Sequence, residues 1–261
     1  MHRRTLFQLL CYKLLGLAGS LIYAQDKVRA LIQEAEQLRR AQRYEEALQK
    51  YEEAIELEPH RAVFHARRGE ILVALRRNEE ALKAYEQALK LYPGLTVAYA
   101  RMAAIYIHQK DYKKAIEAYN QAYQYEMDAD RRIQYKLRAV RLMALQGLTQ
   151  EALTELANLK RDMPSSANSL EVLFVEGQLH LILGNFQNAI AAFQRGYEIT
   201  QLSPEESARF LFGLALAHYE MGNMAEYQKY AQLIQDPRYR RRLQRVIAEL
   251  GALHRANLMS K

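Results

Sequence analysis

Histidine, cysteine, serine and the acidic residues are the side chains of this sequence that can do chemistry, so their spacing is the first question. The seven histidines contain no His-Glu-x-x-His pattern and no other pair at the spacing of a metal site. The sequence has no glycine-rich loop for a phosphate group, and no serine has a histidine or aspartate at the spacing of a known motif. The single cysteine, Cys11, excludes a disulfide framework and a thiolate metal site. We therefore expect no catalytic residue, no cofactor and no metal, and a protein that is not an enzyme.

The net charge of +7 suggests nucleic-acid binding until its distribution is considered. Residues 1–24 carry three basic residues and no acid, and residues 237–261 carry seven basic residues and one acid. The stretch between them, residues 25–236, has 27 basic and 29 acidic residues. A protein that binds a phosphate backbone needs a basic stripe along its body, and this body has none, so no nucleic-acid partner is predicted.

The N-terminus has the order of a secretory signal peptide. Three basic residues within residues 1–13 precede an uncharged run from Leu14 to Ala24, and polar sequence begins at Gln25. The expected cleavage site follows Ala24, with Ala18-Gly19-Ser20 as a second site. The mature protein would then be secreted or periplasmic. The alternatives are an uncleaved membrane anchor over residues 5–24 and an ordinary N-terminal helix.

The rest of the chain repeats one pattern. Three alanines lie 34 residues apart within similar sequence, at Ala47, Ala81 and Ala115. Two later copies, at Ala152 and Ala189, follow at spacings of 37 residues. A fixed period of this size is typical of proteins built from stacked helical units.

At these residues the chain resembles the tetratricopeptide repeat family, in which each unit is two antiparallel helices joined by a tight turn. Further support comes from Gly69 and Leu72 in a first helix and from a turn glycine at Gly147, Gly184 and Gly222. The resemblance covers about residues 28–235 and implies an all-α fold, an α-solenoid of about six repeats with a C-terminal capping helix.

The repeats are expected within residues 25–236, and the capping helix and tail over residues 237–261. The boundaries are about 28–61, 62–95, 96–129, 133–166, 170–203 and 208–236. The sixth repeat matches least well, because Tyr227 stands where the family's anchor alanine is expected.

Residue spacing supports the same fold without the family. In the second helix of each early repeat two alanines lie seven residues apart, which is two helical turns, so both face the same side. A tyrosine falls midway between them: Tyr51, Tyr85 and Tyr119. Small residues on either side of a large one let helices approach closely while the ring fills the gap.

The last helix is predicted to cap the stack with an apolar stripe that includes Tyr239, Leu243, Val246 and Leu250. Its basic residues, Arg238, Arg241, Arg242 and Arg245, are expected to face away from the stack. They are interpreted as a solvated surface, with docking to an acidic partner or an anionic lipid as the alternative.

The resemblance implies that first helices line a concave groove. The residues expected there are Val63, Ala66, Arg67, Glu70, Val97, Ala100, Arg101, Ala104, His108, Leu137 and Arg141. Arg67 and Arg101 are expected at the rim, free to hold acidic groups of a partner. The lysines and asparagines with which some family members grip a peptide carboxylate are absent. His180 and His218 hold equivalent inner positions in the fifth and sixth repeats and are expected to be packed and hydrogen-bonded.

The sequence therefore predicts a non-catalytic scaffold that binds a protein or peptide segment in this groove. The alternatives are a structural accessory subunit of a bacterial envelope assembly or secretion complex, and a cytosolic adaptor if the N-terminus is not cleaved. Membrane contact is expected only through an uncleaved N-terminus or the basic C-terminal helix.

Overall fold

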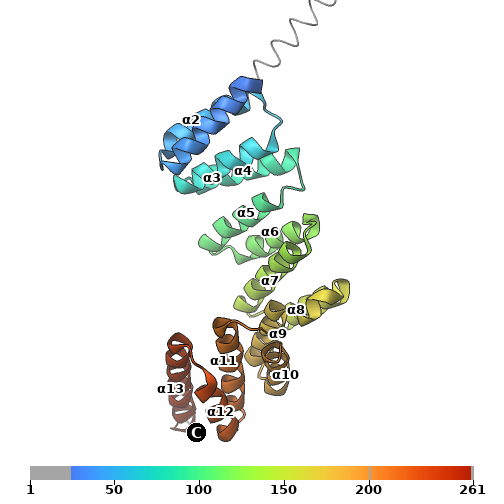
Figure 1. The fold of residues 1–261 in the computed structure, drawn as a ribbon, viewed down its shortest axis with the longest axis vertical. Helices are drawn as coiled ribbons and strands as arrows, with labels where there is room; N and C mark the ends of the chain where they lie inside the picture. The colour runs from blue at the N-terminus through green and yellow to red at the C-terminus, as the bar shows by residue number, and fades with distance from the viewer. Residues whose placement is uncertain (1–24, 200, 260–261) are drawn as a thin grey trace, which may run out of the picture. The chain divides into compact units, whose positions relative to one another are not determined.

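The computed structural model describes residues 25–199 and 201–259, and within these ranges every regular element is a helix (Figure 1). The all-α fold of paired helices that the sequence predicts is confirmed, and it belongs to the α-solenoid class. The predicted signal segment, residues 1–24, lies outside the described residues. No helix within the described ranges combines the length and the apolar character needed to cross a bilayer.

The chain forms two compact units, which the sequence analysis does not predict. The N-terminal unit ends at Met127. Its helices are one over residues 25–40, α2 (Tyr44–Leu57), α3 (Ala62–Ala74), α4 (Asn78–Leu91), α5 (Thr96–His108) and α6 (Tyr112–Tyr125).

The C-terminal unit begins at Asp128. Its helices are α7 (Ala129–Leu145), α8 (Thr149–Asp162), the short 3-10 helix η1 (Pro164–Asn168), α9 (Leu170–Ile182), α10 (Phe186–Tyr197), α11 (Pro204–Glu220), α12 (Met224–Leu233) and α13 (Pro237–Met259). The start of α11 has a capping box, in which Ser203 and Glu206 satisfy each other's backbone N–H groups.

Each turn between the two helices of a repeat contains one residue in the left-handed region. In the C-terminal unit these residues are the predicted turn glycines, Gly147, Gly184 and Gly222, with φ between 72° and 79°. In the N-terminal unit the same turns use Gln42, Arg76 and Lys110, with φ between 60° and 63°. A residue with a Cβ is strained there, whereas glycine is not.

The alanine–tyrosine face is the core of the N-terminal unit. All six alanines of the pattern are fully buried: Ala47, Ala54, Ala81, Ala88, Ala115 and Ala122. Tyr51, Tyr85 and Tyr119 are buried between them, as the spacing predicts. The ring of Tyr85 lies so close to Gly69 that a Cβ there would come within 2.8 Å of it. Glycine is therefore required at Gly69 by this close approach.

Phenylalanine takes the tyrosine's place in part of the C-terminal unit. Phe193 of α10 is buried between Gly177 of α9 and Gly213 of α11, and a Cβ at either glycine would come within 2.7 Å of its ring. Phe193 also contacts Phe174 and Phe210, with ring centroids 5.8 and 6.5 Å away. This aromatic cluster joins the fifth repeat to the sixth.

The sixth repeat differs from the others in its second helix. None of the residues of α12 is buried, and Tyr227, at the anchor position, packs instead on Tyr219 with ring centroids 5.4 Å apart. The core contact is made by Ile234, directly after α12, and by Leu243 of α13, both of which are buried. The last helix therefore covers the end of this unit with part of its predicted apolar stripe.

Candidate protein-binding surfaces

The predicted groove residues of the N-terminal unit lie on α3 and α5, the first helices of the second and third repeats. Val63 and Val97 are 53% and 44% exposed, which is high for valine. Ala66 and Ala100 are half-buried, whereas Ala104 is exposed. His108, at the end of α5, is also exposed. The row is thus accessible along both helices, and its role in binding stays a prediction.

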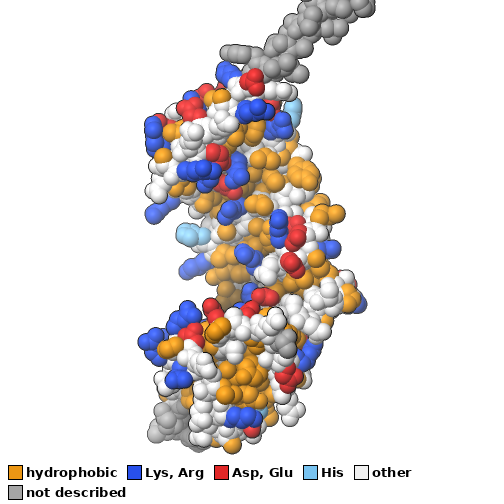
Figure 2. All heavy atoms as spheres, in the orientation of Figure 1, with side chains coloured by type: hydrophobic (Ala, Val, Ile, Leu, Met, Phe, Trp, Pro, Cys, Tyr) orange, Lys and Arg blue, Asp and Glu red, His pale blue; other side chains and the backbone are white. Residues whose placement is uncertain are grey.

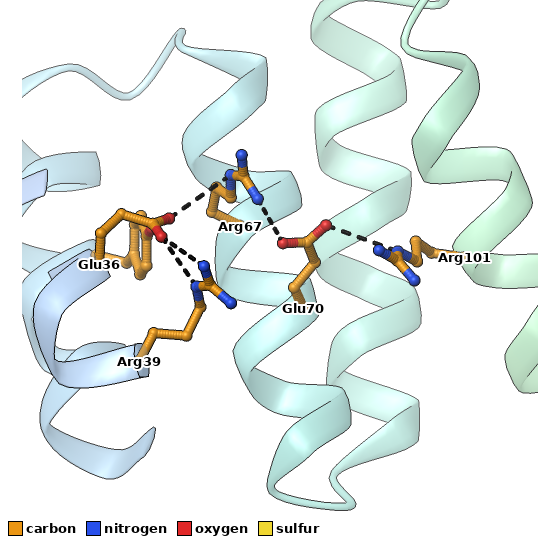
Figure 3. A network of polar contacts seen from close by, with 6 residues as sticks. Glu36, Arg39, Arg67, Glu70 and Arg101 are labelled. Atoms are coloured by element: carbon orange, nitrogen blue, oxygen red, sulfur yellow. Dashed lines mark hydrogen bonds and ion pairs between the residues drawn. The ribbon is translucent and has the colours of Figure 1, made fainter. Parts of the chain in front are cut away.

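A chain of alternating acids and arginines crosses these first helices (Figure 3). Arg39 donates two hydrogen bonds to Glu36, at 2.8 and 2.9 Å, within the helix over residues 25–40. Arg67 of α3 lies 3.8 Å from Glu36 and donates a 2.8 Å hydrogen bond to Glu70. Arg101 of α5 lies 3.6 Å from the other oxygen of Glu70. We call these five residues the ion-pair chain.

The surroundings of Glu36 favour its charged form. Burial works against the carboxylate, but the Tyr51 hydroxyl, which donates a 2.5 Å hydrogen bond, and the Arg39 guanidinium outweigh it. The pKa of Glu36 is therefore below its ordinary value. The hydrogen bond to Glu70 raises the pKa of Arg67 above its ordinary value. The charges of the ion-pair chain therefore stabilise one another.

The ion-pair chain changes the predicted role of the two rim arginines. Arg67 and Arg101 are not free: both are shared with Glu70, and Arg67 also faces Glu36. A partner's carboxylate would have to compete with carboxylates already in place. The apolar row on α3 and α5 therefore offers a partner exposed contact area that no ion pair occupies.

The last two predicted groove residues lie on α7, in the C-terminal unit. Leu137 is fully buried, so its assignment to an accessible groove is wrong. Arg141 is exposed, and its place in a binding groove stays a prediction. Residues four apart on a helix are offset by about 40° around its axis, and the edge of the buried face falls between these two.

A pocket of about 640 Å³ opens on the C-terminal unit between α9, α11 and α13. We call it the C-terminal pocket. Its apolar walls are supplied by first helices and by the last helix: Phe174, Leu181, Phe212, Leu216, Val246 and Leu250. Figure 2 shows Lys and Arg side chains beside hydrophobic ones on this unit. The apolar stripe of α13 is thus only partly used in covering α11.

Two arginines at this pocket lie over aromatic rings. The guanidinium of Arg209 is 4.2 Å from the ring centroid of Phe174, and that of Arg242 is 5.4 Å from the ring centroid of Phe212. Arg242 was expected to face away from the stack with the other arginines of α13. It is exposed but lines the pocket, so that expectation is wrong for this one residue.

Arg141 interacts electrostatically with Arg209. Burial and the positive charge of Arg209 both lower the pKa of Arg141 below its ordinary value, while Glu171 acts in the opposite direction. Within residues 25–199 and 201–259, no carboxylate oxygen lies within 4.0 Å of Arg141, Arg209 or Arg242. These guanidinium groups are therefore not neutralised by contact with an acid.

His180 and His218 are half-buried, as expected for packed side chains. The ring of His218 stacks on Tyr230, with centroids 5.4 Å apart. Each Nδ1 atom is buried without a hydrogen-bond partner in the described part of the chain, so the expected hydrogen bonds are not present at these atoms. Burial lowers the pKa of both imidazoles below the ordinary value.

The prediction from sequence missed several residues of both surfaces. Glu36 and Arg39 were not considered, although their spacing of three residues matches that of Arg67 and Glu70 in the next first helix. Arg209 was also missed. The signal that could have found it is a lone arginine within the otherwise apolar inner sequence Ala208-Arg209-Phe210-Leu211-Phe212.

Comparisons with known proteins agree with this architecture. A family model described as tetratricopeptide repeat matches residues 32–96, 69–131 and 174–226, which together make up more than half of the chain. No curated protein matches the chain.

Several solved structures share the fold. PilW, described as a widely conserved type IV pilus biogenesis factor, is 19% identical, with 84% of this chain and 98% of that chain covered and a TM-score of 0.57. PilF of Pseudomonas aeruginosa is 15% identical, with 85% and 98% covered and a TM-score of 0.56. YrrB, described as a TPR protein with an unusual peptide-binding site, is 18% identical, with 75% and 97% covered and a TM-score of 0.54. At these identities the likeness concerns the fold alone.

Proposed function

Because the chain belongs to the tetratricopeptide repeat family, we propose that it is a non-catalytic scaffold that binds a segment of another protein on the inner helices of its repeats. The observation that carries the proposal is the exposure of Val63 and Val97, two large apolar side chains on neighbouring first helices. An exposed apolar surface patch with a polar rim is typical of a protein contact site.

The alanines of this row explain how a partner would fit. Ala66, Ala100 and Ala104 are small, so a bound segment approaches the backbone of α3 and α5 closely. The segment would place apolar side chains between Val63 and Val97, beside the ion-pair chain. An amphipathic helix or an extended apolar peptide has this character.

A crosslinking experiment tests this surface in the cell. The photoreactive residue p-benzoylphenylalanine replaces Val97, and in a matched control it replaces Leu57, which is 40% exposed at the end of α2, a second helix. We expect a discrete protein adduct from position 97, no such adduct from position 57, and loss of the adduct when Ala100→Glu is added. Circular dichroism melts of the purified variants check that folding is unchanged.

Two outcomes would contradict the proposal. Adducts of equal yield from positions 97 and 57 would show unspecific contact, and the absence of an adduct at 97 would show that this row is not a binding surface. If Ala100→Glu unfolds the protein, the position belongs to the core, and the assignment of the inner row is wrong.

A second candidate function is a structural accessory subunit of a bacterial envelope assembly or secretion complex. The signal-like order of residues 1–24 favours it, since this order would direct the protein to the periplasm. The fold shared with PilW is compatible with such a role. Cell fractionation with N-terminal sequencing tests it: a mature chain that begins near Gln25 in the periplasm supports it. An intact Met1 in the cytosol would favour a cytosolic adaptor, and an intact chain in the membrane would favour an anchor over residues 5–24.

A further inference from the structure

The C-terminal pocket combines apolar walls with arginines from two helices, α11 and α13. Phe174 and Phe212 are two of the aromatic residues that line the pocket, and Arg209 and Arg242 lie over their rings. Arg141 of α7 adds a third guanidinium, close enough to Arg209 for their charges to interact. Two of these cations, Arg209 and Arg242, line the pocket from separate helices, and Arg141 lies near the first of them.

The acids near this pocket do not neutralise these cations. Glu220 lines the pocket, and Glu171 attracts Arg141 electrostatically. Neither forms an ion pair with Arg141, Arg209 or Arg242, since no carboxylate in the described residues lies within 4.0 Å of the three. In the ion-pair chain of the N-terminal unit, by contrast, each arginine pairs with a carboxylate.

Stacking on a ring leaves the hydrogen-bonding capacity of an arginine unused. A guanidinium that lies over an aromatic face keeps its N–H groups in its own plane, available at the edge. The ring also restricts the side chain, so less conformational freedom is lost when an anion binds. Paired N–H donors match the two oxygens of a carboxylate.

We propose that the C-terminal pocket binds an acidic, apolar segment of a partner protein, with a large apolar side chain in the pocket and carboxylates on Arg209, Arg242 and Arg141. This inference rests on the proposed scaffold function and names the chemistry of one partner segment. The cations belong to α7, α11 and α13, so the occupant carries more than one carboxylate along its length. That requirement favours a peptide chain over a fatty acid, which has a single carboxylate at one end.

A dye pair tests the chemistry of the pocket in the full chain. Anilinonaphthalene sulfonate is an apolar anion whose fluorescence rises in an apolar site, and N-phenylnaphthylamine is its neutral counterpart. We expect the double variant Arg209→Gln, Arg242→Gln to lower the affinity for the anionic dye about tenfold and the affinity for the neutral dye less than twofold. The matched control is Arg67→Gln, which removes an inner arginine that is already paired. It should leave the affinities for both dyes unchanged. Circular dichroism melts exclude unfolding as the cause.

A displacement experiment then tests the protein segment itself. The competitor is an acetylated, amidated peptide that alternates leucine and glutamate, and its matched control has glutamine in place of glutamate. We expect the acidic peptide to displace the anionic dye from the wild-type chain at least about tenfold better than the glutamine peptide, and to lose this advantage in the double variant. Raising the salt concentration should weaken binding of the acidic peptide more than binding of the glutamine peptide.

Each other result overturns the inference. Equal displacement by both peptides would show that charge does not contribute to binding. Equal affinity of the wild type and the double variant for the anionic dye would show the same. Displacement by dodecanoate but by neither peptide makes the pocket a lipid site. If position 97 captures a partner but the acidic peptide does not displace the dye, the proposed scaffold function is supported and this inference is wrong. If the acidic peptide displaces the dye but position 97 captures no partner, the binding surface lies in the C-terminal unit alone.

Discussion

The inner arginines of the two units have different neighbours. In the N-terminal unit Arg67 and Arg101 share Glu70, and the adjoining pocket is about 220 Å³. In the C-terminal unit Arg209 and Arg242 lie on phenylalanine rings, beside a pocket of about 640 Å³. The same repeat thus presents inner arginines paired with carboxylates in the N-terminal unit and inner arginines over aromatic rings beside an apolar pocket in the C-terminal unit.

This difference shows that repeated backbone geometry does not imply repeated surface chemistry. Both helices of a repeat contribute to the core, and in α2, α4, α6 and α10 small buried residues flank a buried aromatic one. First helices are free to vary because part of their surface faces solvent. The two inner faces can therefore recognise different segments while the fold between them stays the same.

The largest expected effect concerns the aromatic cluster that supports the C-terminal pocket. Phe193→Ala removes a fully buried ring that lies against Phe174 and Phe210, and we expect the free energy of unfolding to fall by about 3–5 kcal/mol. Urea unfolding followed by circular dichroism measures it. Leu233→Ala, at an exposed position, serves as the control and should change stability by less than about 0.5 kcal/mol. A loss below about 1 kcal/mol for Phe193→Ala would mean that the cluster is not the core of this unit.

The next effect separates two tyrosines of the N-terminal unit at equivalent positions. The Tyr51 hydroxyl donates to Glu36, so Tyr51→Phe should cost about 1.5–3 kcal/mol, the range for a hydrogen bond to a charged group. The Tyr85 hydroxyl is buried with no partner in the described residues, so Tyr85→Phe should leave stability unchanged or raise it slightly. Thermal and urea unfolding of the two variants compare them. Equal losses would show that the ion-pair chain adds nothing to the Tyr51 contact.

A smaller effect is expected at the turns inside the repeats. Gly184→Ala places a Cβ at a φ of 72° in the C-terminal unit and should cost about 1 kcal/mol. Arg76→Gly removes the corresponding strain in the N-terminal unit, at a φ of 61°, and should be neutral or stabilise by up to about 1 kcal/mol. Differential scanning calorimetry of both variants measures the changes. Destabilisation of the same size by both would mean that the two turns are not equivalent.

The smallest effect is a difference in acid sensitivity. The pKa values of His180 and His218 are lowered by burial, so the unfolded state takes up protons first, and these residues cost the fold stability as the pH falls below about 6.5. The pKa of Glu36 is also lowered, but its contribution is complete above the ordinary carboxyl value of about 4.3 and is lost only as the pH falls further.

Hydrogen exchange measured by mass spectrometry checks this order. On acidification, the segment of α9 and α11 should lose protection first, and the segment of α3 should lose it at lower pH, after correction for the intrinsic exchange rate. His180→Phe and His218→Phe should reduce the early loss in the C-terminal unit. If α3 opens first, the groups that we name do not control the acid response.

The core could be predicted from the sequence because it depends on residue type at a fixed spacing. Ala81, Tyr85 and Ala88 lie on one helical face whatever else the chain does, and that face has to be buried. The turn glycines, such as Gly184, could be identified in the same way. Gln42, Arg76 and Lys110 could not, since nothing in these side chains signals a left-handed backbone.

The inner surfaces were harder to predict because they depend on the reach of long side chains. The contact between Arg67 and Glu36 joins helices whose spacing along the chain gives no sign of it. Leu137 was misplaced because a difference of four residues crosses the edge of the buried face of α7. Arg242 was misplaced because the stripe that covers α11 also lines a pocket.

Arginine reactivity in the full chain tests the central contrast most directly. Phenylglyoxal attacks the small neutral fraction of a guanidinium group, and mass spectrometry reports the rate at each arginine. Partial burial and the charge of Arg209 lower the pKa of Arg141, whereas the hydrogen bond to Glu70 raises the pKa of Arg67, and both side chains keep access to solvent. We predict that Arg141 is modified faster than Arg67, and that the acidic peptide protects Arg141, Arg209 and Arg242 but not Arg67. Modification of Arg67 at an equal or higher rate, or protection of Arg67 by the peptide, would contradict the account.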